Sequence, residues 1–184
     1  MPVLTLRSAL SWLATFAGFP LGGVAGRLVA GPVDGAVPAL VGGLVTGAVL
    51  GLVQALGLGR TRPAVGAWVL ATALGLAAGL GLGAGAVSYG TGTSDLVVQG
   101  AVCGAVVGLA QAVVLARRIG PVAAAWPALL AGCWALGWAV TAAIGVEVDL
   151  RFTVFGSSGA VVVTALTLVL PAALARSART AVRS

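Results

Sequence analysis

The sequence predicts an all-α integral membrane protein with six transmembrane helices, and three observations support this fold class. Hydrophobic residues make up 60% of the 184 residues and charged residues only 8%, whereas a soluble domain carries roughly 25% charged residues. The apolar residues gather in six stretches, each close to the ~20 residues that a helix needs to cross the hydrocarbon core. The charged residues lie mostly between these stretches and are sorted by sign. So few charges cannot cover a surface exposed to water, so the expected solvent is the lipid bilayer.

The six expected spans are separated by short connectors that contain Pro, Gly or Arg. They run over residues 9–29, 38–58, 64–87, 96–116, 122–144 and 154–174. We expect helices because every backbone N–H and C=O in the hydrocarbon must be bonded within its own segment, and because the spans lack the alternation typical of a β-barrel. The first stretch follows Arg7, as in a signal peptide. Its length and its place in the repeat described below favour a retained first helix.

The charged residues predict the orientation of the chain. The basic residues on one side of the expected membrane are Arg7, Arg60, Arg62, Arg117, Arg118, Arg176, Arg179 and Arg183. The opposite side holds all four acidic residues and two arginines: Asp34, Asp95, Glu147, Asp149, Arg27 and Arg151. Because arginine-rich short loops stay in the cytoplasm, we expect both termini there, with residues 176–184 as a short basic cytoplasmic tail. The use of Ala, Gly, Val and Arg without Lys favours a bacterial source, and hence the bacterial cytoplasmic (inner) membrane.

An internal repeat divides the chain into three units. The segment Thr46–Leu56, T-G-A-V-L-G-L-V-Q-A-L, reappears 57 residues later as C-G-A-V-V-G-L-A-Q-A-V at Cys103–Val113. A third, weaker copy has S-G-A-V-V at Ser158–Val162, and Leu166 stands in it where the first two copies have Gln. We therefore expect one transmembrane domain over residues 1–184, with repeats at approximately 9–62, 63–119 and 120–175. Each repeat has two spans, so the repeats are parallel and are predicted to surround a pseudo-threefold axis along the membrane normal.

Glycines recur every four residues within the first four spans. These glycines are Gly18, Gly22, Gly26, Gly43, Gly47, Gly51, Gly75, Gly79, Gly83, Gly100, Gly104 and Gly108. Residues at this spacing share one helix face, and small residues there let two helices approach closely in lipid. We predict that the stripes are packing faces. The alternative is that they line a narrow path or let helices slide.

Three polar residues are candidates for function. Gln54 and Gln111 occupy the same repeat position inside their spans, where an amide needs a partner. They are predicted either to form interhelical hydrogen bonds or to build a polar binding site on the axis, with Leu166 breaking the triad. Arg27 lies near the end of the first span, where it is expected to reach the lipid headgroups. The alternatives for Arg27 are an ion pair with Asp34 or contact with a substrate anion.

The hydroxyl and indole side chains are expected to be structural. We predict that threonine hydroxyls within the spans bond to the backbone of the preceding turn; these are Thr15, Thr46, Thr72, Thr141 and Thr164. Trp12, Trp68 and Trp126 begin the odd-numbered spans, as in an interfacial aromatic belt. Cys103 and Cys133 lie within apolar stretches and are expected to act as small hydrophobic residues.

Composition argues against several classes of function. The chain has no His, the commonest metal ligand and general base, so we expect no enzyme, no metal and no cofactor. No Asp or Glu lies in the middle of a span, which disfavours ion-coupled transport. The net charge of +6 comes from scattered arginines rather than from a basic face of the kind that binds nucleic acid, so nucleic acid is not an expected partner.

The repeated G-A-V-x-G-L-x-Q-A, followed by R-x-R-P or R-R-x-x-P and a span that begins with Trp, resembles a loose group of uncharacterised bacterial multi-pass membrane proteins. This resemblance covers about two thirds of the chain and implies no specific activity. Two functions therefore stay open. One is a glycine-packed bundle with a packing, assembly or partner-binding role, whose partners are the lipid bilayer and possible copies of itself or another membrane protein. The other is a passive channel or permease for a small neutral solute, with Gln54 and Gln111 near the axis.

Overall fold

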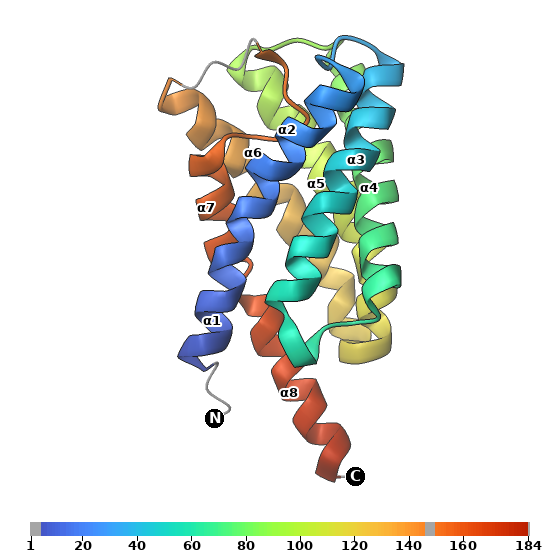
Figure 1. The fold of residues 1–184 in the computed structure, drawn as a ribbon, viewed down its shortest axis with the longest axis vertical. Coiled ribbons are helices and arrows are strands. Elements are labelled where there is room, and N and C mark those ends of the chain that lie inside the picture. Colours follow the sequence, from blue (N-terminus) through green and yellow to red (C-terminus); the bar gives the residue numbers. More distant parts are fainter. Residues whose placement is uncertain (1–4, 146–149, 184) are drawn as a thin grey trace.

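The computed structural model describes residues 5–145 and 150–183, and this part of the chain is helical without any β-strand. Its elements lie roughly along one direction (Figure 1). In chain order they are α1 Leu6–Leu13, η1 Ala14–Ala17, α2 Gly18–Ala30, α3 Ala36–Gly57, η2 Gly59–Thr61, α4 Val65–Ala86, α5 Thr93–Ile119, η3 Gly120–Ala125, α6 Trp126–Ala143, α7 Ser157–Leu166 and α8 Val169–Arg183. The prediction of an all-α fold is confirmed for the described residues.

Five helical segments of the described chain are long and apolar enough to cross a membrane. They are Leu6–Ala30, Ala36–Gly57, Val65–Ala86, Thr93–Ala143 and Ser157–Ala178. The fourth segment, of 51 residues, contains α5, η3 and α6, and α5 and α6 pack against each other. This is the fold of a helical membrane bundle.

The outer surface of the bundle is apolar. Large side chains such as Leu28, Leu82 and Leu109 are 82%, 61% and 62% exposed. Monomeric soluble proteins rarely expose contiguous apolar patches larger than a few hundred Å², whereas lipid accepts such a surface without cost. The helices therefore bury the glycines of their contacts and leave many large apolar side chains on the outer surface, which is the pattern that a bilayer allows.

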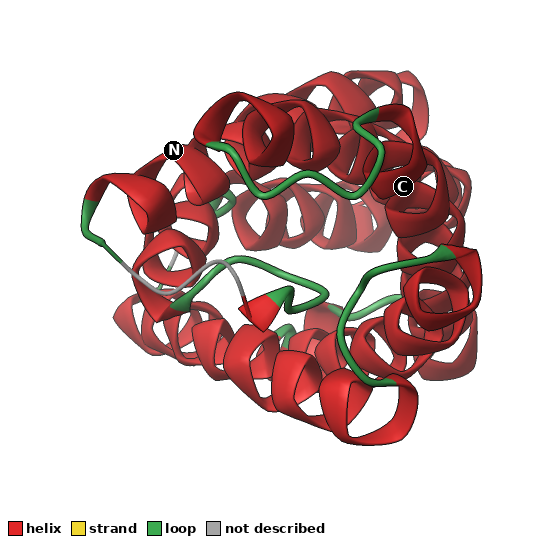
Figure 2. Ribbon diagram, turned by 90° about the horizontal axis from the view of Figure 1, so that it is seen from above, coloured by secondary structure: helices red, strands yellow, loops and turns green. Residues whose placement is uncertain are grey.

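Helices that follow one another in the chain are neighbours in space. α2 packs against α3, α3 against α4, α4 against α5, α5 against α6, and α6 against α7. The ring closes where α7 contacts α1, η1 and α2. Figure 2 shows the resulting arrangement of helices around a common axis.

Connectors at each end of the bundle are tied together by hydrogen bonds. At the end that we call the arginine end, Arg118 donates to the Arg62 carbonyl over 3.4 Å, and the Ser177 hydroxyl donates to the Arg118 carbonyl. The beginning of α1 and the end of α8 lie at this same end (Figure 1). At the opposite end, the acidic end, the Val33 N–H donates to the Arg151 carbonyl over 3.0 Å.

The glycine stripes lie at contacts between consecutive helices. A Cβ at Gly22 of α2 would lie 2.8 Å from the Thr46 carbonyl oxygen of α3. A Cβ at Gly47 of α3 would lie 2.6 Å from the Thr72 carbonyl oxygen of α4. The stripe of α4 faces α5 in the same way, and that of α5 faces α6. All twelve predicted glycines have such a neighbour within 3.1 Å of the added carbon. Each stripe thus faces the helix that comes next in the chain.

The start of the last predicted span differs from the structure. Helix α7 begins at Ser157, whereas the span was expected from residue 154. Thr153, Val154 and Phe155 are non-helical, yet 2%, 4% and 1% exposed. The physical reason is that this segment enters the bundle and finds partners there. The Thr153 and Thr46 hydroxyls are 2.7 Å apart, and the Gly156 N–H donates to Thr141 Oγ1 over 3.1 Å.

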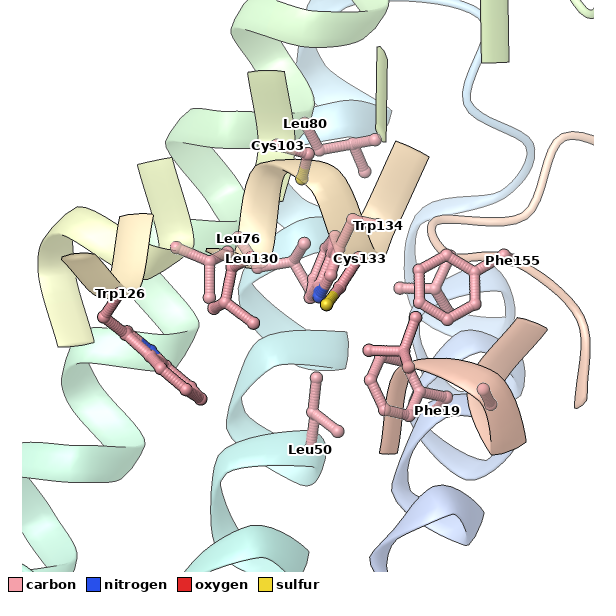
Figure 3. Packing of buried hydrophobic residues seen from close by; sticks show 14 of the residues in the cluster. Phe19, Leu50, Leu76, Leu80, Cys103, Trp126, Leu130, Cys133, Trp134 and Phe155 are labelled. Atoms are coloured by element: carbon pink, nitrogen blue, oxygen red, sulfur yellow. The ribbon is translucent and has the colours of Figure 1, made fainter. Parts of the chain in front are cut away.

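An aromatic cluster fixes this entering segment. Phe155 stacks on Phe19, with ring centroids 4.9 Å apart, and meets Trp134 edge-on at 5.5 Å. Figure 3 shows these rings together with the leucines and cysteines that surround them. Aromatic pairs in these geometries add roughly 0.5–1.5 kcal/mol each beyond the burial of their area. The segment is therefore part of the core.

The expectation that Trp12, Trp68 and Trp126 form an interfacial belt is wrong. Their side chains are 2%, 0% and 7% exposed, inside the bundle. Trp12 Nε1 donates to the Thr164 carbonyl over 3.1 Å and lies 3.3 Å from Thr167 Oγ1. For Trp12 and Trp126 the interior supplies the polar partners that a belt residue would find among the headgroups, so these two indoles can be buried.

Four of the five threonine predictions are confirmed, and the fifth is wrong. The hydroxyls of four residues donate to carbonyls three or four residues earlier; these are Thr15, Thr72, Thr141 and Thr164. Thr46 Oγ1 instead donates across the helix contact to the Gly22 carbonyl over 2.9 Å. The glycine brings the α2 backbone close enough for this bond, so Thr46 links two helices.

We predict that Gly47→Ala lowers the free energy of unfolding in detergent by about 1–3 kcal/mol, the usual effect of overpacking a tight contact. The added carbon would meet backbone atoms of Thr72 and Ala73, which cannot move without displacing α4. The measurement is unfolding by heat or by denaturing detergent. Gly132→Ala is the matched control, because nothing lies within 4 Å of a Cβ at that helical glycine. Equal stability of the two variants would remove the packing role of the stripe.

Candidate functional site

Gln111 is the centre of a buried polar cluster. It lies on α5 and is 2% exposed. Its Oε1 accepts a hydrogen bond from Trp126 Nε1 over 2.8 Å, and its Nε2 donates to Thr72 Oγ1 over 2.9 Å. Thr72 Oγ1 in turn donates to the Trp68 carbonyl. One amide thereby joins α4, α5 and α6.

The structure brings the two repeat-related glutamines together. Gln111 Nε2 lies 3.4 Å from Gln54 Oε1, a long hydrogen bond between α5 and α3. Leu166 does not complete a triad, because its side chain is 45% exposed on the outer surface. The glutamine pair therefore has no third member at the aligned position, in line with the prediction that Leu166 breaks the triad. Helix α7 ends at Leu166, and Thr164 and Thr167 face the interior in its place.

The space around this cluster is nearly filled. A cavity of about 10 Å³ remains between Gln54, Gln111 and Phe19. The remaining walls are bulky or hydrogen-bonded side chains, including Trp12, Trp126, Trp134, Leu130 and Thr167. One water needs roughly 10–15 Å³ of such volume. The polar cluster therefore has room for about one water between these described side chains.

One indole donor near the core is left without an acceptor. Trp68 is fully buried, and its Nε1 has no hydrogen-bond partner among the described residues. A buried donor without a partner costs roughly 1–3 kcal/mol. Trp68 and Trp126 both stand at the beginning of a predicted span, but only the Trp126 N–H has an acceptor, Gln111 Oε1.

A much larger hollow opens sideways, between α2 and α6. We call it the lateral groove; its volume is about 410 Å³. It is lined by Pro20, Gly23, Val24, Trp138, Thr141, Ile144, Phe152, Val154, Phe155, Gly156, Ser157 and Ser158. Most of these side chains are apolar, and the Ser158 hydroxyl is itself buried. The lateral groove reaches the outer surface, because Val24 and Ile144 are 51% and 60% exposed.

Arg27 lies in a second hollow, the Arg27 hollow, which continues the lateral groove toward the acidic end. It has a volume of about 350 Å³ and shares Val24 and Phe152 with the groove. The guanidinium carbon lies 5.2 Å from the centre of the Phe152 ring, and Nη1 donates to the Leu150 carbonyl. Asp34, named as an alternative partner in the sequence analysis, forms no ion pair with Arg27 among the described residues. Arg27 is half-buried, and the hollow leaves room beside it.

The candidate residues therefore belong to two separate places. Gln54 and Gln111 meet in a filled interior cluster, and Arg27 borders an open surface hollow. Sequence analysis missed the lateral groove, because its walls combine residues far apart in the chain. Trp138 and the S-S-G at Ser157–Gly159 were the only local signals. Two of the predicted charges, Glu147 and Asp149, lie outside the described residues, as do the side chains of Arg179 and Arg183.

The described residues offer little reactive chemistry. Cys103 and Cys133 are buried free thiols, and the described part of the chain has no group of three His, Cys, Asp or Glu side chains. No known protein family, curated protein or solved structure matches the chain.

We predict that Trp126→Phe lowers the free energy of unfolding by about 1 kcal/mol more than Trp68→Phe. Both variants remove the same atoms from buried positions. Trp126→Phe also leaves Gln111 Oε1 without its donor, whereas Trp68→Phe removes an N–H that has no partner. Unfolding of the two variants in the same detergent measures the difference. A larger loss for Trp68→Phe would show that the Gln111 cluster contributes little.

Proposed function

We propose that the chain is a six-span protein of the bacterial cytoplasmic membrane that acts by binding a partner or ligand within the bilayer. The number of six spans depends on whether the segment Thr93–Ala143 crosses the membrane once or twice. As one straight helix its 51 residues would measure about 77 Å, more than twice the hydrocarbon thickness of ~30 Å. Because α5 and α6 pack side by side, we infer that this segment crosses the membrane twice.

The charge distribution supports an orientation with both termini in the cytoplasm. Arg62 and Arg118 are joined at the arginine end, where α1 begins and α8 ends. Asp34, in the connector between α2 and α3, and Asp95, in the first turn of α5, lie at the other end. Arginine-rich connectors stay on the cytoplasmic side, so the acidic end faces the periplasm.

Hydrogen bonds around the axis support the three-repeat architecture. Trp126 of the third repeat bonds to Gln111 of the second, and Trp12 of the first bonds to Thr164 of the third. Each bond joins the leading Trp of one repeat to the second helix of the preceding one. By the same relation, Trp68 of the second repeat would donate to Gln54 of the first. This third bond is not formed, and the Trp68 N–H has no acceptor among the described residues. The pattern is cyclic, as expected of a pseudo-threefold axis.

One observation supports binding rather than conduction. The axis holds a cavity of about 10 Å³, whereas the lateral groove holds about 410 Å³ and faces the bilayer. A passive channel would require the indoles of Trp12 and Trp126 to leave their hydrogen bonds. The glycine stripes then act as packing faces that keep the axis closed.

We predict that proteoliposomes containing the purified protein are no more permeable to glycerol or urea than empty liposomes. Stopped-flow light scattering after an osmotic step measures this rate. The double variant Gln54→Leu/Gln111→Leu should give the same low rate. Solute flux that the wild type supports and the double variant loses would replace this proposal with the permease.

We predict opposite labelling of two exposed positions, one at each end of the bundle. Ser94 lies at the acidic end and is exposed; Val122 lies at the arginine end and is 68% exposed. In cells with a permeabilised outer membrane, an impermeant maleimide should label Ser94→Cys at once and Val122→Cys only after lysis. Wild-type protein is the background control, because Cys103 and Cys133 are buried. Labelling of both sites in intact cells would rule out the six-span topology.

A further inference from the structure

The lateral groove exists because the last repeat has a short second helix. Thr46 and Cys103, which correspond in the repeat, are each the eleventh residue of their helices, α3 and α5. Ser158, their counterpart, is the second residue of α7. Helix α7 therefore lacks nine residues, about 14 Å of helix, at the acidic end. Residues 151–156 pass through this region in a non-helical course and leave space beside α2 and α6.

The walls of the lateral groove suit a hydrocarbon chain. Val24 of α2 and Ile144 after α6 form its rims, and Phe155 closes its inner side. Its volume of about 410 Å³ lies within the 300–1,000 Å³ of typical ligand sites. Since the groove opens between two membrane-facing helices, water does not fill it, and the molecules that reach it are lipids. An acyl chain matches both its chemistry and its access.

Arg27 supplies a charge next to this apolar groove. The guanidinium has five N–H donors, and the described structure uses Nη1 for the Leu150 carbonyl while Phe152 lies beside the group. These two contacts position the Arg27 guanidinium without neutralising its charge. Arginine binds phosphate through paired N–H groups. Arg27 is four residues from Gly31, the end of α2, so it lies at the depth of lipid headgroups.

We propose that the lateral groove and the Arg27 hollow together bind one anionic phospholipid, with an acyl chain in the groove and the phosphate on Arg27. The two hollows share Val24 and Phe152, so one molecule can occupy both. A free phosphate would use only the Arg27 hollow and leave the groove empty. This inference rests on the proposed function and names the class of ligand that the bundle binds.

The test is native mass spectrometry of delipidated protein titrated with phosphatidylglycerol or with phosphatidylcholine. We expect the wild type to retain one phosphatidylglycerol about tenfold more tightly, a ratio that corresponds to ~1.4 kcal/mol. Both lipids carry a phosphate, but the choline cation of phosphatidylcholine offsets its charge and repels Arg27. Arg27→Gln should bring the two affinities together, and Arg27→Lys should restore part of the preference. Val24→Trp, which places a large ring at the groove rim, should weaken binding of both lipids.

Leu21→Trp is the matched control for the groove. Leu21 lies on the same helix, is 59% exposed and is not part of either hollow, so this variant should bind lipid as the wild type does. Thermal unfolding in detergent shows that each variant is folded before it is compared.

Equal affinity of the wild type for both lipids, or full binding by Val24→Trp, would overturn the lipid site. Tighter retention of palmitate than of phosphatidylglycerol would overturn it in favour of a free fatty acid. These outcomes are distinct from failure of the proposed function. Impermeable proteoliposomes combined with absent lipid binding would leave the closed bundle standing and remove only the site.

Discussion

Close approach of neighbouring helix backbones is the constraint on which the rest of this structure depends. In lipid, helices gain little from the hydrophobic effect when they associate, so packing at short range must supply the attraction. Gly47 and Gly104 leave no space for a side chain between α3 and α4 or between α5 and α6. The same closeness lets Thr46 reach a carbonyl of α2. Because each stripe faces the following helix, the chain order itself becomes the order of helices around the ring.

The polar interior follows from this close packing. Once the helices approach, an amide inside the bundle cannot reach water and must find partners on other helices. Gln111 finds three, on α3, α4 and α6. A satisfied network of this kind sets the relative register of the helices, and it also fills the axis. Polarity inside this bundle therefore serves cohesion, while the largest described hollow lies at the periphery, beside the non-helical residues 151–156.

Much of the fold could be predicted from the sequence, because span length and glycine spacing are local properties. The expected limits 38–58 and 64–87 fall within two residues of α3 and α4, and the repeat correctly paired Gln54 with Gln111. Properties that depend on distant segments were missed. Nothing near Trp12 shows that Thr164, 152 residues away, will accept its N–H, so an interfacial position was the natural expectation. The entry of Phe155 into the core could not be predicted for the same reason, because its partner Phe19 lies far away in the sequence, on α2.

The contact between the first and last helices also orders the events of biosynthesis. Helices α2 to α6 can pack in sequence as each leaves the ribosome, because every stripe meets the next helix to emerge. The seam between α1, η1 and α7 has no such local partner. Trp12 has no acceptor for its N–H, and Phe19 lacks its stacking partner, until Thr164 and Phe155 have been synthesised and inserted. The nascent bundle is therefore an open ring until α7 is inserted, and its closure depends on residues 155–167.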